Sequence, residues 1–277
     1  MGPGCIGVFD SGVGGLSVLR EIRNQLPHED VLYLADQAHV PYGARPLEEV
    51  REFARGITRF LLEEGAKIIV VACNTASAAA LQDLRSEFPR TPFVGMEPAV
   101  KPAAQISRTR RVGVLATPAT FEGRLFASVV ERFGSGVEIV PQTFPGLVKR
   151  IEAGDLDGAE TRAIVLSGLR PLLDRQVDTI VLACTHYPFV IPILREIAGP
   201  TVTVIDPSPA IARQTARLLT ERGLEVKRDR PGHLQLMSTA GPERLAAMAE
   251  RLIGESAEAR SVVWLGDTIQ SPYPTGN

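Results

Sequence analysis

The sequence is short of cysteine, of net charge and of long apolar runs, and each shortage excludes a class of protein. Its 277 residues include three cysteines, Cys5, Cys73 and Cys184, too few and too odd a number for a disulfide framework. With 30 basic and 32 acidic side chains the net charge is −2, so we expect neither nucleic acid nor an anionic membrane as a partner. No apolar run approaches the ~18 residues that a membrane span needs.

Targeting signals are also missing from the first residues. Residues 1–8 lack the basic region that opens a signal peptide, and Ile6 stands where a myristoylation signal needs Ser or Thr. We therefore expect a cytoplasmic protein with free thiols, because a reducing compartment does not sustain disulfides. Such thiols are either buried in a core or chemically active, and their local context decides between the two.

Apolar runs alternate with helical patterns along the chain. Residues 68–72 and 179–183 are continuously apolar, as expected of parallel strands covered on both faces. Residues 47–61 follow the 3.6-residue period of a helix that Pro46 opens as its first residue and Gly65 closes. The other strand-like runs are 5–9, 31–34, 92–96, 112–116, 137–140, 202–205, 233–237 and 262–265. This alternation predicts an α/β fold with mostly parallel sheets, and the length suggests about two domains.

The chain also repeats itself weakly, in the same order and at nearly constant spacing. The matched pairs of segments are 7–11 with 113–117, 69–75 with 180–186, and 96–98 with 205–207, at offsets of 106, 111 and 109. We interpret this as two similar α/β halves. Each match is a strand followed by a polar loop, and open α/β sheets bind ligands where such loops follow the strands.

Cys73 and Cys184 occupy equivalent positions in the two halves. Each ends an apolar strand, in Ala-Cys-Asn-Thr and in Ala-Cys-Thr-His, and a helix is expected to start after Cys73. The partly positive end of that helix should lower the thiol pKa from ~8.5 and favour the thiolate. Two thiols that flank one cleft suit the inversion of a carbon centre, because one face must lose a proton while the other gains one. His186, two residues after Cys184, is placed to relay protons.

A dinucleotide site is an alternative interpretation of the first strand and its turn. Residues 12–15 are glycine-rich and resemble an anion-binding turn, and Asp36 follows at about the distance of the dinucleotide fingerprint. Ser17 stands in place of the third glycine, however, and Asp10 would repel a pyrophosphate. Asp10 is instead suited to bind an ammonium group or to tune a nearby thiol.

Several other residues have both a functional and a plain structural interpretation. A zinc site made of the two equivalent cysteines and His186 fits no common ligand spacing, so we expect no metal. Residues 41–43 form a turn that is either a ligand contact or a simple loop. Cys5 is expected in the core, and His28 and His39 are expected at the surface.

Taken together, these segments resemble the cofactor-independent aspartate/glutamate racemase family, and within it the glutamate racemases. The resemblance covers about residues 5–265 and rests on residues 7–15, 40–43, 72–77 and 184–188. It implies an isomerase that interconverts L- and D-glutamate for peptidoglycan synthesis, without pyridoxal phosphate, any other cofactor or a metal. Its members are often homodimers.

The resemblance also implies where the domains and the site lie. The first domain would comprise residues 1–97 plus 208–277 and the second residues 98–207, with the active site in the cleft between them. Cys73 would act on the D isomer and Cys184 on the L isomer, assisted by Asp10 and His186. The implied substrate contacts are Asp10, Ser11, Pro41, Tyr42, Gly43, Asn74, Thr75, Thr117, Thr120, Thr185 and His186. Asp36 and Glu152 are further helpers whose roles stay open.

Within the family, His186 favours glutamate, because related aspartate racemases usually have Glu at this position. The sequence departs from the family pattern at residues 37–39, Gln-Ala-His, where Thr-Ala-Arg is more common, and over the looser stretch 144–152. Three other activities remain open at this stage. They are a racemase of a related amino acid such as aspartate, a cysteine hydrolase that uses one thiol with His186, and a sensor that binds an amino acid without turnover.

Overall fold

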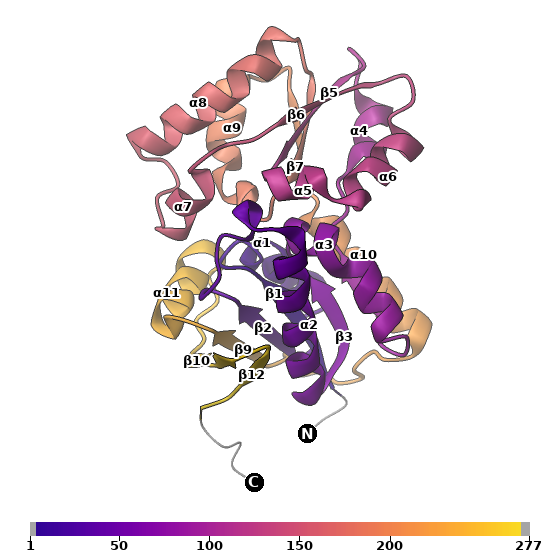
Figure 1. Ribbon diagram of the computed structural model, residues 1–277, viewed down its shortest axis with the longest axis vertical. Helices are drawn as coiled ribbons and strands as arrows, with labels where there is room; N and C mark the ends of the chain where they lie inside the picture. The colour runs from indigo at the N-terminus through magenta and orange to yellow at the C-terminus, as the bar shows by residue number, and fades with distance from the viewer. Residues whose placement is uncertain (1–3, 273–277) are drawn as a thin grey trace.

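Two parallel β-sheets form the framework of the protein (Figure 1). The computed structural model describes residues 4–272. The first sheet has six strands in the order β10-β9-β2-β1-β3-β4, and the second has four in the order β6-β5-β7-β8. All neighbouring strands within these two sheets are parallel, and a separate antiparallel hairpin joins β11 to β12. The predicted α/β class with mostly parallel sheets is confirmed.

The strands lie within two residues of the ten expected runs, and two strands were not expected. The first sheet contains β1 (Cys5–Asp10), β2 (Val31–Ala35), β3 (Ala66–Val71), β4 (Phe93–Gly95), β9 (Leu234–Ser238) and β10 (Ala259–Ser261). The second contains β5 (Arg111–Ala116), β6 (Glu138–Gln142), β7 (Thr179–Ala183) and β8 (Thr203–Ile205), and the hairpin contains β11 (Val263–Leu265) and β12 (Thr268–Gln270). The unexpected strands, β10 and β12, are three residues each and are mostly half-buried or exposed, so they carry no continuous apolar run.

The order of the strands repeats between the two sheets. The run β2-β1-β3-β4 corresponds to β6-β5-β7-β8, so β1 is equivalent to β5 and β3 to β7. Val8 of β1 pairs with Tyr33 and Val70 on its two sides, just as Val114 of β5 pairs with Pro141 and Val181. The two similar halves inferred from the sequence are therefore present, and the strand ends that carry Cys73 and Cys184 are structurally equivalent.

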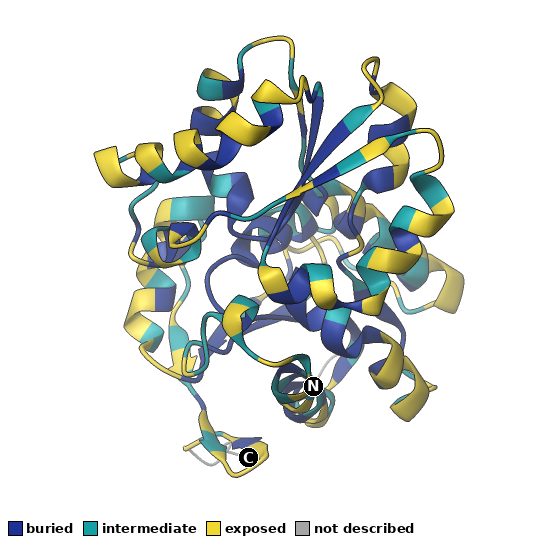
Figure 2. Cartoon of the chain, turned by 45° about the horizontal axis from the view of Figure 1, so that its top comes forward, coloured by how far each residue is buried: buried dark blue, intermediate teal, exposed yellow. Residues whose placement is uncertain are grey.

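Helices cover both faces of each sheet, and apolar side chains fill the layers between them. Figure 2 shows the strands largely buried and the outer sides of the helices exposed. The helices are α1 (Leu16–Gln25), α2 (Leu47–Glu63), α3 (Asn74–Glu87), α4 (Val100–Ile106), α5 (Pro118–Glu122), α6 (Arg124–Phe133), α7 (Leu147–Glu152), α8 (Ala159–Asp174), α9 (Ile191–Ala198), α10 (Ser208–Arg222) and α11 (Pro242–Ile253), with short 3₁₀ turns η1 (Tyr42–Ala44) and η2 (Tyr187–Val190). On the first sheet α1, α10 and α11 cover one face and α2 and α3 the other. On the second sheet α7, α8 and α9 oppose α4 and α6.

The bounds of α2 show how local signals set a helix. Gly65 has φ +88, a conformation that glycine adopts without steric cost, and it ends the helix as expected. Pro46 is the residue before the helix and not its first residue, because its ψ of 139° is extended. The expectation for Pro46 was therefore wrong by one position.

The chain returns to the first sheet after completing the second. Helix α10 packs on α1, and β9 then pairs with β2, so the first sheet contains segments from both ends of the described chain. Figure 1 shows this return as the orange and yellow segments beside the indigo strands. Within residues 4–272, no helix combines the length and the apolar character needed to cross a membrane.

Candidate active site

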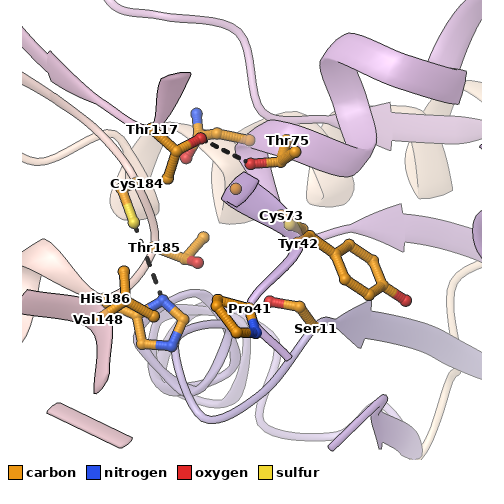
Figure 3. A pocket seen from close by; sticks show the side chains of 12 residues that line it. Ser11, Pro41, Tyr42, Cys73, Thr75, Thr117, Val148, Cys184, Thr185 and His186 are labelled. Atoms are coloured by element: carbon orange, nitrogen blue, oxygen red, sulfur yellow. Dashed lines mark hydrogen bonds between the residues drawn. The ribbon is translucent and has the colours of Figure 1, made fainter. Parts of the chain in front are cut away.

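A cavity of ≈ 310 Å³, its open mouth included, lies where the carboxyl ends of both sheets meet (Figure 3). Its lining consists of Ser11, Pro41, Tyr42, Gly43, Cys73, Asn74, Thr75, Thr117, Val148, Cys184, Thr185 and His186. Every one of these except Val148 is a site residue predicted from the sequence. Two other predicted residues, Asp10 and Thr120, are 0% and 2% exposed and lie behind the lining.

The fold brings these residues together from four strand ends. Ser11 follows β1 and Thr117 follows the equivalent strand β5, whereas Cys73 and Cys184 lie just past the ends of β3 and β7. Parallel strands that stand side by side end at the same edge of a sheet, so each half contributes a row of polar groups. The two cysteines therefore enter the cavity from different halves (Figure 3).

Cys73 lies in surroundings that disfavour its thiolate. A helix starts directly after Cys73, as expected, and Cys73 is the N-cap of α3, with its Sγ accepting a hydrogen bond from the backbone N–H of Ala76 at 3.5 Å. Burial nevertheless raises the pKa of the Cys73 thiol well above 9.0, and the carboxylate of Asp10 raises it further. The predicted lowering of this pKa was wrong, because desolvation and an anionic neighbour outweigh one weak N–H contact.

The carboxylate of Asp10 accepts hydrogen bonds from the backbone N–H groups of the glycine-rich turn that follows it. Its Oδ2 accepts from the N–H groups of Gly15 at 2.9 Å and Gly12 at 3.3 Å, and Thr185 donates to Oδ1 at 3.4 Å. Burial raises the pKa of Asp10, against the effect of these donors and of His186. The turn does bind an anion, but the anion belongs to the protein, so no pyrophosphate can be held there. The dinucleotide interpretation is therefore wrong.

Cys184 lies next to a buried imidazole that is itself held by a carboxylate. Nδ1 of His186 is 3.8 Å from Sγ of Cys184, and its Nε2 is 2.6 Å from Oε1 of Glu152. Burial acts to lower the pKa of His186, but Cys184 and Glu152 together raise it well above 6.5. Burial acts to raise the pKa of Glu152, and His186 outweighs it, so that this pKa is lowered. The pair is therefore an imidazolium and a carboxylate at neutral pH.

The two sulfurs thus face opposite charges across one cavity. The carboxyl group of Asp10 lies beside Cys73, whereas the imidazolium of His186 lies beside Cys184. The sequence placed His186 two residues from Cys184, but it did not show which of the two thiols Asp10 lies beside. Glu152, which the sequence left as an uncertain helper, is 115 residues or more from its partners Gln37 and Val13 along the chain.

Polar side chains between the two sulfurs offer free hydrogen-bonding capacity. Asn74 is 3% exposed, and among the described residues neither atom of its side-chain amide has a hydrogen-bond partner. Leaving a buried amide unpaired is costly, which points to a polar ligand. The hydroxyls of Thr75, Thr117 and Thr120 lie within 2.9–3.2 Å of one another and close one side of the cavity.

Asp36 does not line the cavity but holds the loop that does. Its carboxylate accepts from Tyr42 Oη at 2.6 Å, Thr239 Oγ1 at 2.7 Å and Trp264 Nε1 at 2.8 Å. His39 lies 2.9 Å from the same carboxylate and stacks on a phenylalanine, with a quarter of its side chain exposed. His39, which was expected at the surface, is therefore half-buried. Nothing in the sequence marks Trp264, which is 228 residues from Asp36.

The lining of the cavity holds neither lysine nor arginine. A second cavity of ≈ 700 Å³ opens beside the first, shares Pro41, Gly43, Thr117 and Val148 with it, and is mainly apolar apart from Lys149. Within residues 4–272, no group of three or more His, Cys, Asp or Glu is arranged to hold a metal ion. Cys5, which was expected in the core, is half-buried and packs against the apolar cluster between the first sheet and α2 and α3.

Comparison with known proteins identifies the family. The profile of the Asp/Glu/Hydantoin racemase family matches residues 6–215. The chain belongs to this family. It is 52% identical over 248 residues to the glutamate racemase of Roseiflexus sp. (strain RS-1), covering 89% of this chain and 91% of that protein. Family membership makes it an amino-acid racemase, an isomerase.

Solved structures agree with this assignment. The chain resembles a glutamate racemase isoform from Bacillus anthracis with a TM-score of 0.86 at 31% identity, covering 94% of this chain and 97% of the other. It also resembles the glutamate racemase of Francisella tularensis in complex with D-glutamate, with a TM-score of 0.82 at 28% identity, covering the same shares of the two chains. The two-sheet architecture is therefore that of the racemase family.

Proposed function

We propose that this chain interconverts L- and D-glutamate by moving the α-proton between Cys184 and Cys73. The observation that carries the proposal is the pair of equivalent thiols on opposite sides of one cavity, one beside a cation and the other beside an anion. The relatives named above are glutamate racemases, and the one from Francisella tularensis binds D-glutamate. Both findings favour glutamate as the substrate of this chain as well.

The proposal gives each sulfur a role. Cys184, whose sulfur lies 3.8 Å from Nδ1 of His186, acts as the thiolate base that takes the α-proton from L-glutamate. The electron pair of the broken C–H bond stays on the α-carbon. Cys73 starts as the thiol, which its raised pKa favours, and gives its proton to the opposite face. The product is D-glutamate with Cys184 as thiol and Cys73 as thiolate, and the reverse reaction restores the starting state.

Neutral donors hold the substrate in this proposal. The side-chain amide of Asn74 and the hydroxyls of Ser11, Thr75 and Thr117 all lie at the cavity, with no arginine among the lining residues. Several neutral N–H and O–H groups can together bind a carboxylate without a paired cation. Because the free amide of Asn74 has both a donor and an acceptor, it suits an amino acid, which carries both an ammonium group and carboxylates.

We also propose a division of the chain into two domains, one for each sheet. We place one domain at residues 1–97 plus 208–277 and the other at 98–207, since the first sheet and α10 belong to the former and the second sheet to the latter. Closure of the two domains would exclude water from the reacting α-carbon. From the family resemblance we also propose a cytoplasmic enzyme without cofactor, active as a homodimer, whose D-glutamate is used for peptidoglycan.

The decisive experiment follows optical rotation and α-deuterium uptake while the protein is incubated with L-glutamate in D₂O. Racemisation with one deuterium incorporated per inversion supports the proposal. Binding of glutamate without either change would point to a sensor and contradict it.

One observation also favours a second candidate, a cysteine hydrolase. The sequence of contacts Cys184–His186–Glu152 is that of a nucleophile, a base and an orienting carboxylate. This candidate predicts a covalent acyl-enzyme on Cys184, visible by mass spectrometry after incubation with glutamine or glutamate esters. The racemase proposal predicts no such adduct.

A further inference from the structure

Glu152 joins the two halves of the protein at a point that also orients His186. It ends α7 in the second half, yet its Oε1 accepts from the backbone N–H of Val13 in the first half at 2.8 Å. The same oxygen lies within hydrogen-bonding distance of Nε2 of His186, at 2.6 Å. Its other oxygen, Oε2, accepts from Nε2 of Gln37, which belongs to the first half, at 3.1 Å. Both carboxylate oxygens therefore depend on contacts across the cleft.

We propose that Gln37 is a positioning residue for the racemase reaction: by holding Oε2 of Glu152, it aims the imidazole of His186 at Cys184. This inference rests on the proposed function, because it assigns Gln37 to the half of the reaction that Cys184 performs. Gln37 itself does not line the cavity. It acts through two intermediates, Glu152 and His186.

The physical reason is the geometry of a carboxylate. A carboxylate held by one oxygen can still turn about its last side-chain bond, whereas one held by both oxygens has a fixed plane. Gln37 supplies the contact to Oε2, and the donors to Oε1 are Val13 and His186. With the plane of Glu152 fixed, the imidazole keeps its Nδ1 3.8 Å from Sγ of Cys184.

The packing of α7 does not depend on Gln37. The guanidinium of Arg244, on α11 in the first half, donates to the backbone carbonyl of Glu152. The turn at Gly12 lies so close to the Glu152 carboxylate that an added Cβ would collide with it. These contacts dock the end of α7, so the loss of Gln37 should free the carboxylate without displacing the helix.

Two substitutions test the role of Gln37 in the full-length protein. Gln37→Met keeps the length of the side chain and removes its donor, and Gln37→Glu keeps its shape and opposes one carboxylate to another. We expect Gln37→Met to lower kcat for racemisation about fivefold, with KM within about twofold, and Gln37→Glu to lower kcat further. The matched control is Gln82→Met, on the exposed side of α3, which should leave both constants unchanged.

Half-reactions distinguish positioning from a general structural role. In a Cys73→Ser background Cys184 is the remaining thiol of the cavity, and α-deuterium uptake from L-glutamate should fall about fivefold when Gln37→Met is added. In a Cys184→Ser background, uptake from D-glutamate should change less than about twofold. An equal fall in both backgrounds, or a Gln37→Met enzyme that matches Gln82→Met, overturns the inference and leaves the racemase function standing. A wild-type protein that does not racemise glutamate overturns both.

Discussion

The hydroxyl oxygens of Thr75 and Thr117 lie 3.0 Å apart, although the two residues belong to different halves of the molecule. Thr75 is in the first turn of α3, and Thr117 caps α5. Thr120 completes a triangle of hydroxyls with them. On this side of the cavity the halves thus meet through hydroxyls, and on the other side they meet through Glu152. Both contacts are polar, which suits the closure of the two domains proposed above.

The hydroxyl triangle yields the first prediction. Thr117→Val should raise KM for glutamate about tenfold, because it removes a hydroxyl that faces the cavity and a hydrogen bond to a charged group contributes about 1.5–3 kcal/mol. Thr120→Val removes a hydroxyl of the same triangle that does not reach the cavity, so its KM should change far less. Steady-state kinetics on both isosteric variants provide the measurement. Equal effects of the two variants would show that these hydroxyls only hold the two halves together and do not contact the substrate.

Replacement of each cavity cysteine gives the second prediction. Cys73→Ser and Cys184→Ser should each lose net racemisation by at least about 10²-fold, because a hydroxyl is a far poorer base than a thiolate. Burial raises the pKa of the third thiol, Cys5, to about 11, and it lies outside the cavity, so Cys5→Ser serves as the control and should retain activity. Racemisation at the wild-type rate by either of the first two variants would rule out the two-thiol mechanism.

The pH dependence of the reaction gives the third prediction. The pKa of His186 is raised well above 6.5, so the imidazolium persists through neutral pH and is lost only as the pH rises through that higher value. We therefore expect kcat/KM to be flat near neutral pH and to fall on the alkaline side. The titratable groups that face His186 are Glu152, Cys184 and Asp10.

Replacing Glu152 should move this alkaline limb in a defined direction. Glu152→Gln removes a negative charge that raises the pKa of His186, so the limb should shift to lower pH. Glu160→Gln is the control, because this carboxylate on α8 is 66% exposed, pairs with Arg150 and is not among the groups that shift the pKa of His186. Rate profiles from pH 6 to about pH 10 measure the shift. An alkaline limb that stays in place in Glu152→Gln would exclude His186 as its source.

The choice of substrate gives the fourth prediction. The donors that line the cavity have fixed positions, so a shorter acidic side chain leaves some of them unpaired, at roughly 1–3 kcal/mol each. Glutamate should therefore be racemised with a kcat/KM at least ~10-fold above that of aspartate. Kinetics on the four enantiomers, measured by chiral chromatography, decide the matter. Equal efficiency on both amino acids would mean that the side-chain pocket has been assigned to the wrong residues.

Much of the fold and most of the cavity lining could be predicted from the sequence. Strands such as β7 are continuously apolar, and the glycine after α2 adopts a positive φ, so both are visible in local patterns. The repeat placed Cys73 and Cys184 at equivalent strand ends, and parallel topology brings the polar groups of each half to the carboxyl edge of its own sheet. The expected residues around the two sulfurs line one cavity because these two edges face each other in the tertiary structure.

The tertiary structure alone decided the electrostatics of the site. The direction of the Cys73 pKa depends on burial and on the distance to Asp10, neither of which a local pattern contains. The contact of Gln37 with Glu152 joins residues 115 positions apart, and that of Asp36 with Trp264 joins residues 228 apart. Periodicity and spacing report how each segment folds by itself, whereas these contacts form only when separate segments pack together and exclude water.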